Sequence, residues 1–225
     1  MKLFSTLFII VLTGCSHDGD FAANNNVNLN PYNESRPVEV VFRELIDTIE
    51  QLSGKSTCLN KPATDDAIMQ AEIAVGEPFP EDVKTIYKLA DGQKDTQNCA
   101  PIFLEGYHFM SLKYVVQQWT LMKQLYDQDK DFGALYDKQG AVNGYHWTPK
   151  WIPLGFFMSG DFICIDNEPT ASGFNGQIIE FIHDDIPRTH LAVNFNAYLG
   201  YILKNIASEK IVYRQDWGVL TKHKD

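Results

Sequence analysis

The sequence has few of the residues from which metal, redox or nucleotide chemistry is usually built. It contains four cysteines but no CxxC pair and no Cys/His cluster, which argues against a structural zinc site. It also lacks a GxSxG elbow, an HExxH helix and a glycine loop that could cradle phosphate. The apolar stretch at 3–12 is too short to persist as a membrane-spanning helix. These absences predict a protein that is not an enzyme of a familiar class and that holds no cofactor.

Positive charge is also scarce. The chain has 19 Lys and Arg residues against 29 Asp and Glu residues, a formal net charge of −10. This balance disfavours electrostatic binding to nucleic acid or to anionic lipid, and it would steer the protein toward a basic protein partner. Acidity can equally serve only to keep a secreted protein soluble, and composition does not decide between these two interpretations.

The first fifteen residues contain, in order, one basic residue, an apolar run and small residues before a cysteine. The final step consists of Leu12, Thr13, Gly14 and Cys15 and resembles the lipobox of bacterial lipoproteins. It predicts a signal peptide over 1–14 and lipidation of Cys15, so that a lipid anchor holds the protein on a membrane, facing the periplasm. The resemblance also implies that Ser16 favours the outer membrane over the inner one. The alternative is an ordinary apolar helix with a chance cysteine.

The remaining 211 residues suit one domain with a tether. Residues 16–37 contain six asparagines and two prolines with little apolar material, so 15–37 is predicted to be the lipidated cysteine and a disordered tether. The apolar pattern that begins at Val38 predicts a folded domain over 38–210, and we expect 211–225 to form a C-terminal tail.

Hydrophobic periodicity divides this domain into a helical first half and a strand-rich second half. Helices are expected at 38–52, 65–75, 80–90, 112–126 and from 195, with Thr64, Ser111 and Asn194 as N-caps and Gly54 and Gly76 as helix ends. Short apolar runs predict strands at 151–157, 161–166, 177–183 and 191–193. Helices followed by strands and a closing helix indicate an α+β fold, with an antiparallel sheet of about 4–6 strands flanked by helices.

Three cysteines remain after Cys15. Cys58 and Cys99 lie in polar, loop-like stretches, whereas Cys164 lies in the apolar run FICI and is expected to be a buried strand residue. In an oxidising periplasm, two cysteines can pair. We therefore predict a Cys58–Cys99 disulfide, which closes a loop of about forty residues and contributes about 3–4 kcal/mol.

Several motifs in the same order resemble the SUKH superfamily, which includes the Smi–Knr cell-wall assembly regulators. The first is a G-x-x-(F/L)-P-x-D step followed by a helix that ends in DGQ, and the second is a W-I-P…G-D…C-(I/L)-D strand pair. The matching residues are Gly76, Phe79, Pro80, Asp82, Asp91, Gly92, Gln93, Trp151, Ile152, Pro153, Gly160, Asp161, Cys164 and Asp166. Gly176, Gln177, His183, Asp184 and Asp185 match the next strand. The resemblance covers about residues 64–203.

This resemblance implies function by binding, because many bacterial members are immunity proteins that neutralise toxins delivered between competing bacteria. A lipidated, periplasm-facing member would meet a toxin that acts on the wall or the membrane, and a type VI secretion system is a plausible route of delivery. The hypothesis is therefore an immunity protein that binds its cognate toxin, expected to present a basic face, by occlusion. The alternative is a non-enzymatic scaffold or regulator of the cell envelope.

An acidic and histidine cluster is the strongest candidate for other chemistry. It consists of Asp161, Asp166, His183, Asp184, Asp185 and His190. If adjacent strands brought three of these together they could bind a metal ion, as in a metal-dependent envelope hydrolase, but carboxylates in turns more often accept backbone N–H groups. We therefore predict no metal site. The predicted partner-binding residues are Trp151, Asp161, Asp166, Asp184 and Asp185.

Overall fold

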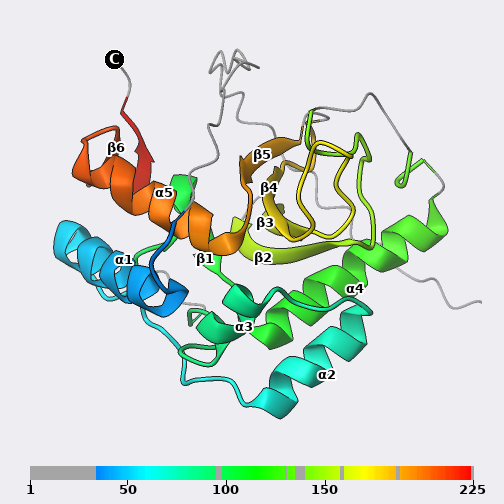
Figure 1. Ribbon diagram of the computed structural model, residues 1–225, viewed down its shortest axis with the longest axis horizontal. Helices are drawn as coiled ribbons and strands as arrows, with labels where there is room; N and C mark the ends of the chain where they lie inside the picture. Colours follow the sequence, from blue (N-terminus) through cyan, green and yellow to red (C-terminus); the bar gives the residue numbers. More distant parts are fainter. Residues whose placement is uncertain are drawn as a thin grey trace, which may run out of the picture.

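The computed structural model describes residues 34–94, 98–129, 131–134, 140–157, 160–185 and 188–223. The predicted signal peptide, Cys15 and residues 16–33 of the predicted tether lie outside the described residues. The rest forms a mixed α+β domain, as predicted, in which helices surround a central antiparallel sheet (Figure 1). No helix among the described residues is both long and apolar enough to span a membrane.

The central sheet has five strands in the order β1-β2-β3-β4-β5, and every neighbouring pair is antiparallel. The strands are β1 (His108–Phe109), β2 (Trp151–Phe157), β3 (Asp161–Asp166), β4 (Gln177–Phe181) and β5 (Thr189–Ala192). The predicted strands at 151–157 and 161–166 match β2 and β3, whereas β4 ends two residues before the predicted end at His183. Strand β5 begins two residues before and ends one residue before the predicted 191–193. Because Trp151 pairs with Asp166 and Phe157 pairs with Asp161, these two aspartates occupy opposite ends of β3.

All five predicted helices are present. They are α1 (Val38–Ser53), α2 (Asp65–Val75), α3 (Glu81–Tyr87), α4 (Leu112–Gln128) and α5 (Phe195–Ala207). The side chains of Thr64, Ser111 and Asn194 each accept a hydrogen bond from the backbone N–H three residues later, so all three predicted N-caps are confirmed. Gly54 and Gly76 end their helices in the left-handed conformation, also as predicted.

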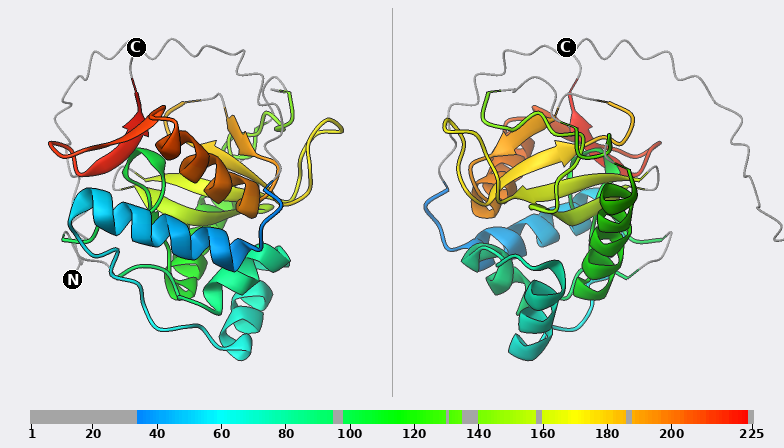
Figure 2. Two further views of the ribbon diagram at one scale, coloured as in Figure 1. Left: turned by 60° about the vertical axis from the view of Figure 1, so that its left-hand side comes forward. Right: turned by 90° about the vertical axis from the view of Figure 1, so that its right-hand side faces the viewer.

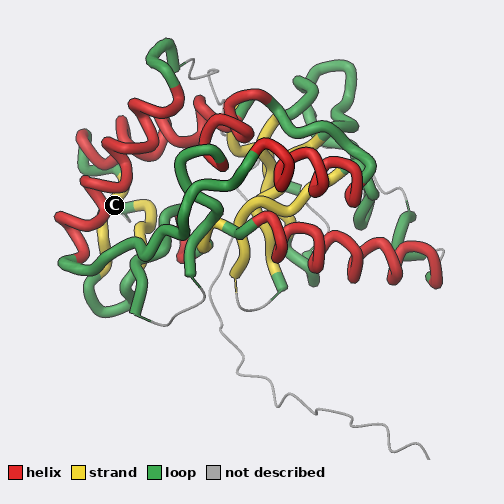
Figure 3. Tube along the Cα trace, turned by 90° about the horizontal axis from the view of Figure 1, so that it is seen from below, coloured by secondary structure: helices red, strands yellow, loops and turns green. Residues whose placement is uncertain are grey.

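Helices cover both faces of the sheet, which explains why β3 is buried along most of its length (Figure 2). On one face, the ring of Phe156 packs on Phe162, and Tyr114 of α4 contacts Phe156 with ring centroids 5.2 Å apart. On the other face, α5 contacts β4 and β5 and lies beside α1. Phe103 links this face to α5 through ring contacts with Phe195 and Tyr198. Helix α2 packs against α4 (Figure 3).

The C-terminal residues form part of the fold, so the predicted tail over 211–225 is wrong for its described part. Strands β6 (Ile211–Arg214) and β7 (Val219–Lys222) form an antiparallel hairpin. Ile211 and Leu220 are buried in the hydrophobic core. Strand β7 also contacts the short 3-10 helix η1 (Leu104–Gly106). Each strand has only four residues, which is too few for a clear period-two pattern.

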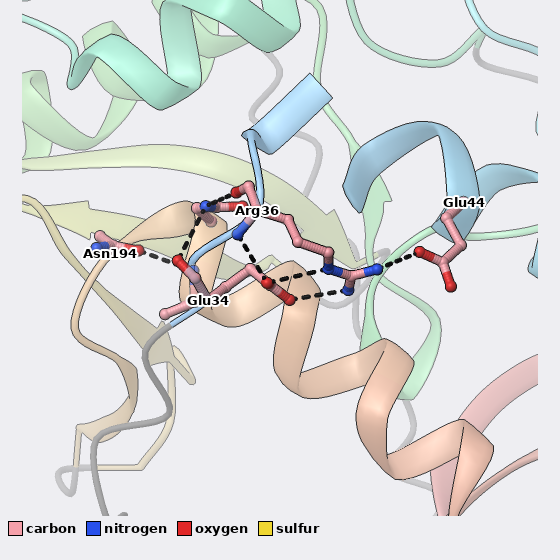
Figure 4. Close-up of polar contacts among 6 residues, drawn as sticks. Glu34, Arg36, Glu44 and Asn194 are labelled. Atoms are coloured by element: carbon pink, nitrogen blue, oxygen red, sulfur yellow. Dashed lines mark hydrogen bonds and ion pairs between the residues drawn. The ribbon is translucent and has the colours of Figure 1, made fainter. Parts of the chain in front are cut away.

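The domain begins at least four residues before its predicted start at Val38. The Asn196 side chain donates hydrogen bonds to the backbone carbonyls of Glu34 and Arg36. The Arg36 guanidinium lies between the carboxylates of Glu34 and Glu44 and forms an ion pair with each (Figure 4). The end of the predicted tether is therefore fixed beside the first turns of α1 and α5.

Candidate functional site

Trp151 and Asp166 are both fully buried, so the prediction that they are available to a partner is wrong. The Trp151 indole Nε1 donates to Asp166 Oδ1 at 2.9 Å, and Gln177 Nε2 donates to Oδ2 at 2.8 Å. The backbone N–H of Glu168 also donates to Oδ1, at 2.8 Å. Burial raises the pKa of the Asp166 carboxyl, while these three hydrogen bonds oppose that rise. This carboxylate therefore has a structural role: it joins β2, β3 and β4.

Asp161 is held in a local contact at the opposite end of β3. Its Oδ1 accepts a hydrogen bond from the backbone N–H of His183 at 2.9 Å and lies 2.8 Å from Nδ1 of the same residue. This contact ties the residues just after β4 to the start of β3. His190 instead bonds the Ala192 carbonyl through Nε2. Within the described ranges, no group of three or more His, Cys, Asp or Glu side chains is placed to hold a metal ion.

Asp184 and Asp185 are exposed in the turn between β4 and β5, as a partner-binding role requires. Buried Arg188 holds this turn from beneath. Its guanidinium donates to the backbone carbonyls of Ile182, Asp185 and His146 and stacks over the Phe181 ring at 4.4 Å. Asp184 and Asp185 are therefore exposed beside a buried arginine that hydrogen-bonds the backbone next to them.

His146 connects this turn to the segment that follows α4. Its ring contacts Phe132 at 4.9 Å and Phe181 at 6.1 Å between centroids. Burial, and then the nearby Arg188 charge, lower the pKa of His146, which favours a neutral ring at this junction. Asp129 and Asp131, both exposed, lie in the segment that Phe132 anchors.

We call the surface formed by Asp129, Asp131, Asp184 and Asp185 the acidic loop face. Arg188, in the connection between β4 and β5, is buried, so the exposed charges of this face among the described residues of its two loops are the four carboxylates. Lys130, which lies between Asp129 and Asp131 in the sequence, is outside the described residues. Sequence reasoning identified Asp184 and Asp185 but missed Asp129 and Asp131, because only the tertiary contact through His146 brings the two loops together.

A small cavity lies near this face, and sequence reasoning missed it. It has a volume of about 270 Å³ and is lined by Tyr126, Tyr145, Thr148, Pro149, Lys150 and Glu168. These residues come from α4, from the loop before β2 and from the loop after β3. The Tyr126 ring contacts Trp147, whose ring in turn contacts Phe132 of the acidic loop segment.

Comparison with known families identifies the fold. A family model described as "SMI1 / KNR4 family (SUKH-1)" matches residues 62–200, more than half of the chain. The chain belongs to this family. A SUKH-1 relative, the "Cell wall assembly regulator SMI1" of Saccharomyces cerevisiae, is 24% identical over 217 residues. That match covers 79% of this chain but only 43% of the yeast protein's length.

The SUKH-1 motif residues join segments inside the fold. The DGQ motif is an example: the Gln93 side chain donates to the carbonyls of Thr57 and Ala100 and accepts from the backbone N–H of Phe109. Gly92 has a φ of +68°, and a Cβ on it would lie 2.3 Å from the Ser111 backbone nitrogen. Only glycine fits this close approach without displacing the backbone.

The motif segment before α3 also contacts the motif segment between β3 and β4. A Cβ on Gly176 would lie 3.0 Å from Cγ of Pro80, and the Asn167 side chain donates to the Pro78 carbonyl. These contacts hold the segment before α3 against the loop that connects β3 to β4. SUKH-1 members are in general regulators or immunity proteins rather than catalysts.

Proposed function

We propose that this protein is a non-enzymatic immunity protein that binds a bacterial toxin and neutralises it by occlusion. The acidic loop face is the observation that carries the proposal, because it presents exposed carboxylates beside buried Arg188 and packed His146. Such a face is complementary to a basic protein surface, and charge complementarity accelerates association and selects partners. Membership of SUKH-1, which includes immunity proteins, supports the same conclusion.

The decisive test is protection from a toxin. The product of the neighbouring gene would be directed to the periplasm of a sensitive cell, with and without this protein. We expect survival only when this protein is present, together with a complex of fixed stoichiometry after purification. Normal killing in its presence, combined with no complex, would rule out this toxin as the partner.

Charge reversal tests whether the acidic loop face makes the contact. We expect the double variant Asp184→Lys and Asp185→Lys to slow association with the toxin by about tenfold or more, because rim charges act mainly on the association rate. Surface plasmon resonance at low and physiological salt would measure the rate. The matched control reverses two exposed carboxylates elsewhere, Asp47 of α1 and Asp66 of α2. Equal slowing by both variants would show a general charge effect and exclude this face as the contact.

The lipobox-like sequence leads us to propose further that the protein is anchored through Cys15 and faces the periplasm, at the outer membrane. An anchored protein would meet a toxin that arrives in that compartment, including one delivered by a type VI secretion system. Cells grown with a labelled palmitate analogue should incorporate the label into the wild-type chain but not into a Cys15→Ser variant. Equal labelling of the two chains would contradict the assignment.

An envelope scaffold remains the second candidate, because the yeast relative is named as a cell wall assembly regulator. It would bind proteins of its own cell in the absence of any toxin. A metal-dependent hydrolase is not proposed. Its required carboxylates, Asp161 and Asp166, lie at opposite ends of one strand, and Asp166 is buried by hydrogen-bonded neighbours.

A further inference from the structure

The small cavity beside the acidic loop face has a fixed carboxylate in its lining. Glu168 Oε2 accepts a hydrogen bond from the Thr148 hydroxyl at 2.9 Å, and Oε1 accepts one from the Tyr145 hydroxyl at 3.4 Å. The backbone of the same residue is held at both ends, since its N–H donates to Asp166 and its carbonyl accepts from the Asn143 side chain. A carboxylate has about four acceptor positions, so each oxygen can accept another donor.

Two tyrosines line the same cavity, and other aromatic residues hold each of them. Tyr126 contacts Trp147 at 5.8 Å, and Tyr145 contacts Trp151 at 6.4 Å between ring centroids. Burial and the nearby Glu168 charge raise the pKa of the Tyr145 hydroxyl, which keeps this phenol protonated and donating. The Tyr145 ring is therefore neutral and able to contact a cation through its face. The Tyr126 ring already contacts one cation, since the Lys123 ammonium lies 5.9 Å from its centroid.

The cavity has one basic lining residue, and a carboxylate neutralises it. The Lys150 ammonium forms an ion pair with Glu77. The formal charge of Glu77, Lys150 and Glu168 together is thus −1. An anionic ligand would meet the Glu168 carboxylate, whereas a cationic ligand would meet an available acceptor beside two aromatic rings. The charge and the ring chemistry both favour a cation.

We infer that this cavity receives one arginine or lysine side chain of a protein partner, with its cationic group beside Tyr126 and Tyr145 and hydrogen-bonded to Glu168. Its volume of about 270 Å³ is below the range typical of sites for whole drug-sized ligands, so it suits the end of a single long side chain. Arginine matches it best, because a guanidinium can both stack on an aromatic ring and bond a carboxylate through two N–H groups.

The inference rests on the proposed function in one respect, namely that the cation belongs to a protein bound at the acidic loop face. Tyr126 lies about one helical turn before Asp129, the C-cap of α4 and a member of that face. A partner that covers the acidic loop face could therefore insert a basic side chain into the cavity. The site itself can be tested without the partner.

The test uses N-acetyl-L-argininamide as the probe and the full chain labelled with 3-fluorotyrosine. Of the ten tyrosines, the signals of Tyr126 and Tyr145 would be assigned from Tyr→Phe variants. We expect these two ¹⁹F signals to shift saturably at millimolar probe. The corresponding citrulline amide, which has nearly the same shape but no charge, should bind at least about tenfold more weakly, because both the cation–π contact and the charge-assisted hydrogen bonds are lost.

Matched variants separate the site from a general charge effect. Glu168→Gln should weaken argininamide binding by about tenfold or more, whereas Asp47→Asn on α1, a helix that contributes no residue to the cavity lining, should leave it unchanged. If Glu168→Gln disturbs the fold, which the dispersion of the remaining ¹⁹F signals would reveal, Tyr126→Leu replaces it and should give the same loss.

Two results would overturn the inference: equal binding of the arginine and citrulline amides, or unshifted Tyr126 and Tyr145 signals at the highest soluble probe concentration. Because no toxin takes part, the outcome is independent of the protection assay. Failure of argininamide binding with intact protection would remove only the cavity inference. Argininamide binding without protection from the toxin would support the cavity inference and reject only the proposal that this toxin is the partner.

Discussion

An Asp166→Ala variant is expected to lose about 3–5 kcal/mol of its free energy of unfolding. The substitution removes the acceptor of three donors, namely the buried Trp151 indole N–H, the buried Gln177 side-chain amide and the part-buried Glu168 backbone N–H. The Gln177 amide keeps its second bond, to the Ala141 carbonyl. Each unsatisfied buried group costs about 1–3 kcal/mol, and the three costs are not fully additive because the site can relax or admit water. Urea unfolding followed by circular dichroism would measure the loss.

The matched control is Asp184→Ala. Both aspartates belong to the motif segments that resemble the family, but Asp184 is exposed, so its replacement should change the free energy of unfolding by less than about 0.5 kcal/mol. The order of the two effects should be reversed for binding to the proposed toxin. There Asp184→Ala should slow association directly, because the side chain is exposed, and Asp166→Ala should not. If Asp166→Ala were as stable as Asp184→Ala, the buried carboxylate could not be a structural junction.

Removal of the disulfide between Cys58 and Cys99 is expected to cost about 4 kcal/mol of stability. The two cysteines are bonded in the structure and lie 41 residues apart in the sequence. The link restricts the unfolded chain, and a closed loop of this length corresponds to about 4 kcal/mol of lost conformational entropy. Gln93 also bridges the two segments, through Thr57 and Ala100, so the double variant Cys58→Ser and Cys99→Ser should keep the fold at reduced stability.

Reduction provides the control for this prediction. Dithiothreitol should lower the urea midpoint of the wild-type chain toward that of the double serine variant, and it should leave the variant itself unchanged. Cys164 should not interfere, because it is buried in β3 and burial raises the pKa of its thiol. Stability of the double variant equal to that of the oxidised wild type would show that the disulfide does not stabilise the fold.

The fold was largely predictable because its helices have strong local signals. The N-caps Thr64, Ser111 and Asn194 and the terminal Gly54 and Gly76 set the helix boundaries through interactions within one turn. Elements defined by distant contacts were not predictable. Strand β1 has two residues, and the β6–β7 hairpin is held by a few buried side chains that contact residues far away in the sequence.

The candidate site was less predictable for a related reason. The sequence shows that Asp161, Asp166 and Asp184 are acidic, but not which of them finds donors inside the fold. Asp166 and Trp151 pair across two strands, and that pairing makes them core residues. The cavity depends on Tyr126, Tyr145 and Glu168, which come from separate segments, and no local pattern marks their meeting.

The burial of Trp151 and Asp166 has a consequence for how such proteins diverge. The two residues lie in the motif by which the family resemblance is detected, yet neither reaches the surface. Two homologues can therefore share this motif while their exposed loop residues acquire unrelated partners, since Asp131 and Asp184 are themselves at the surface. If the protein neutralises toxins as proposed, this arrangement would let the exposed loops change with the toxin while the buried framework stays the same.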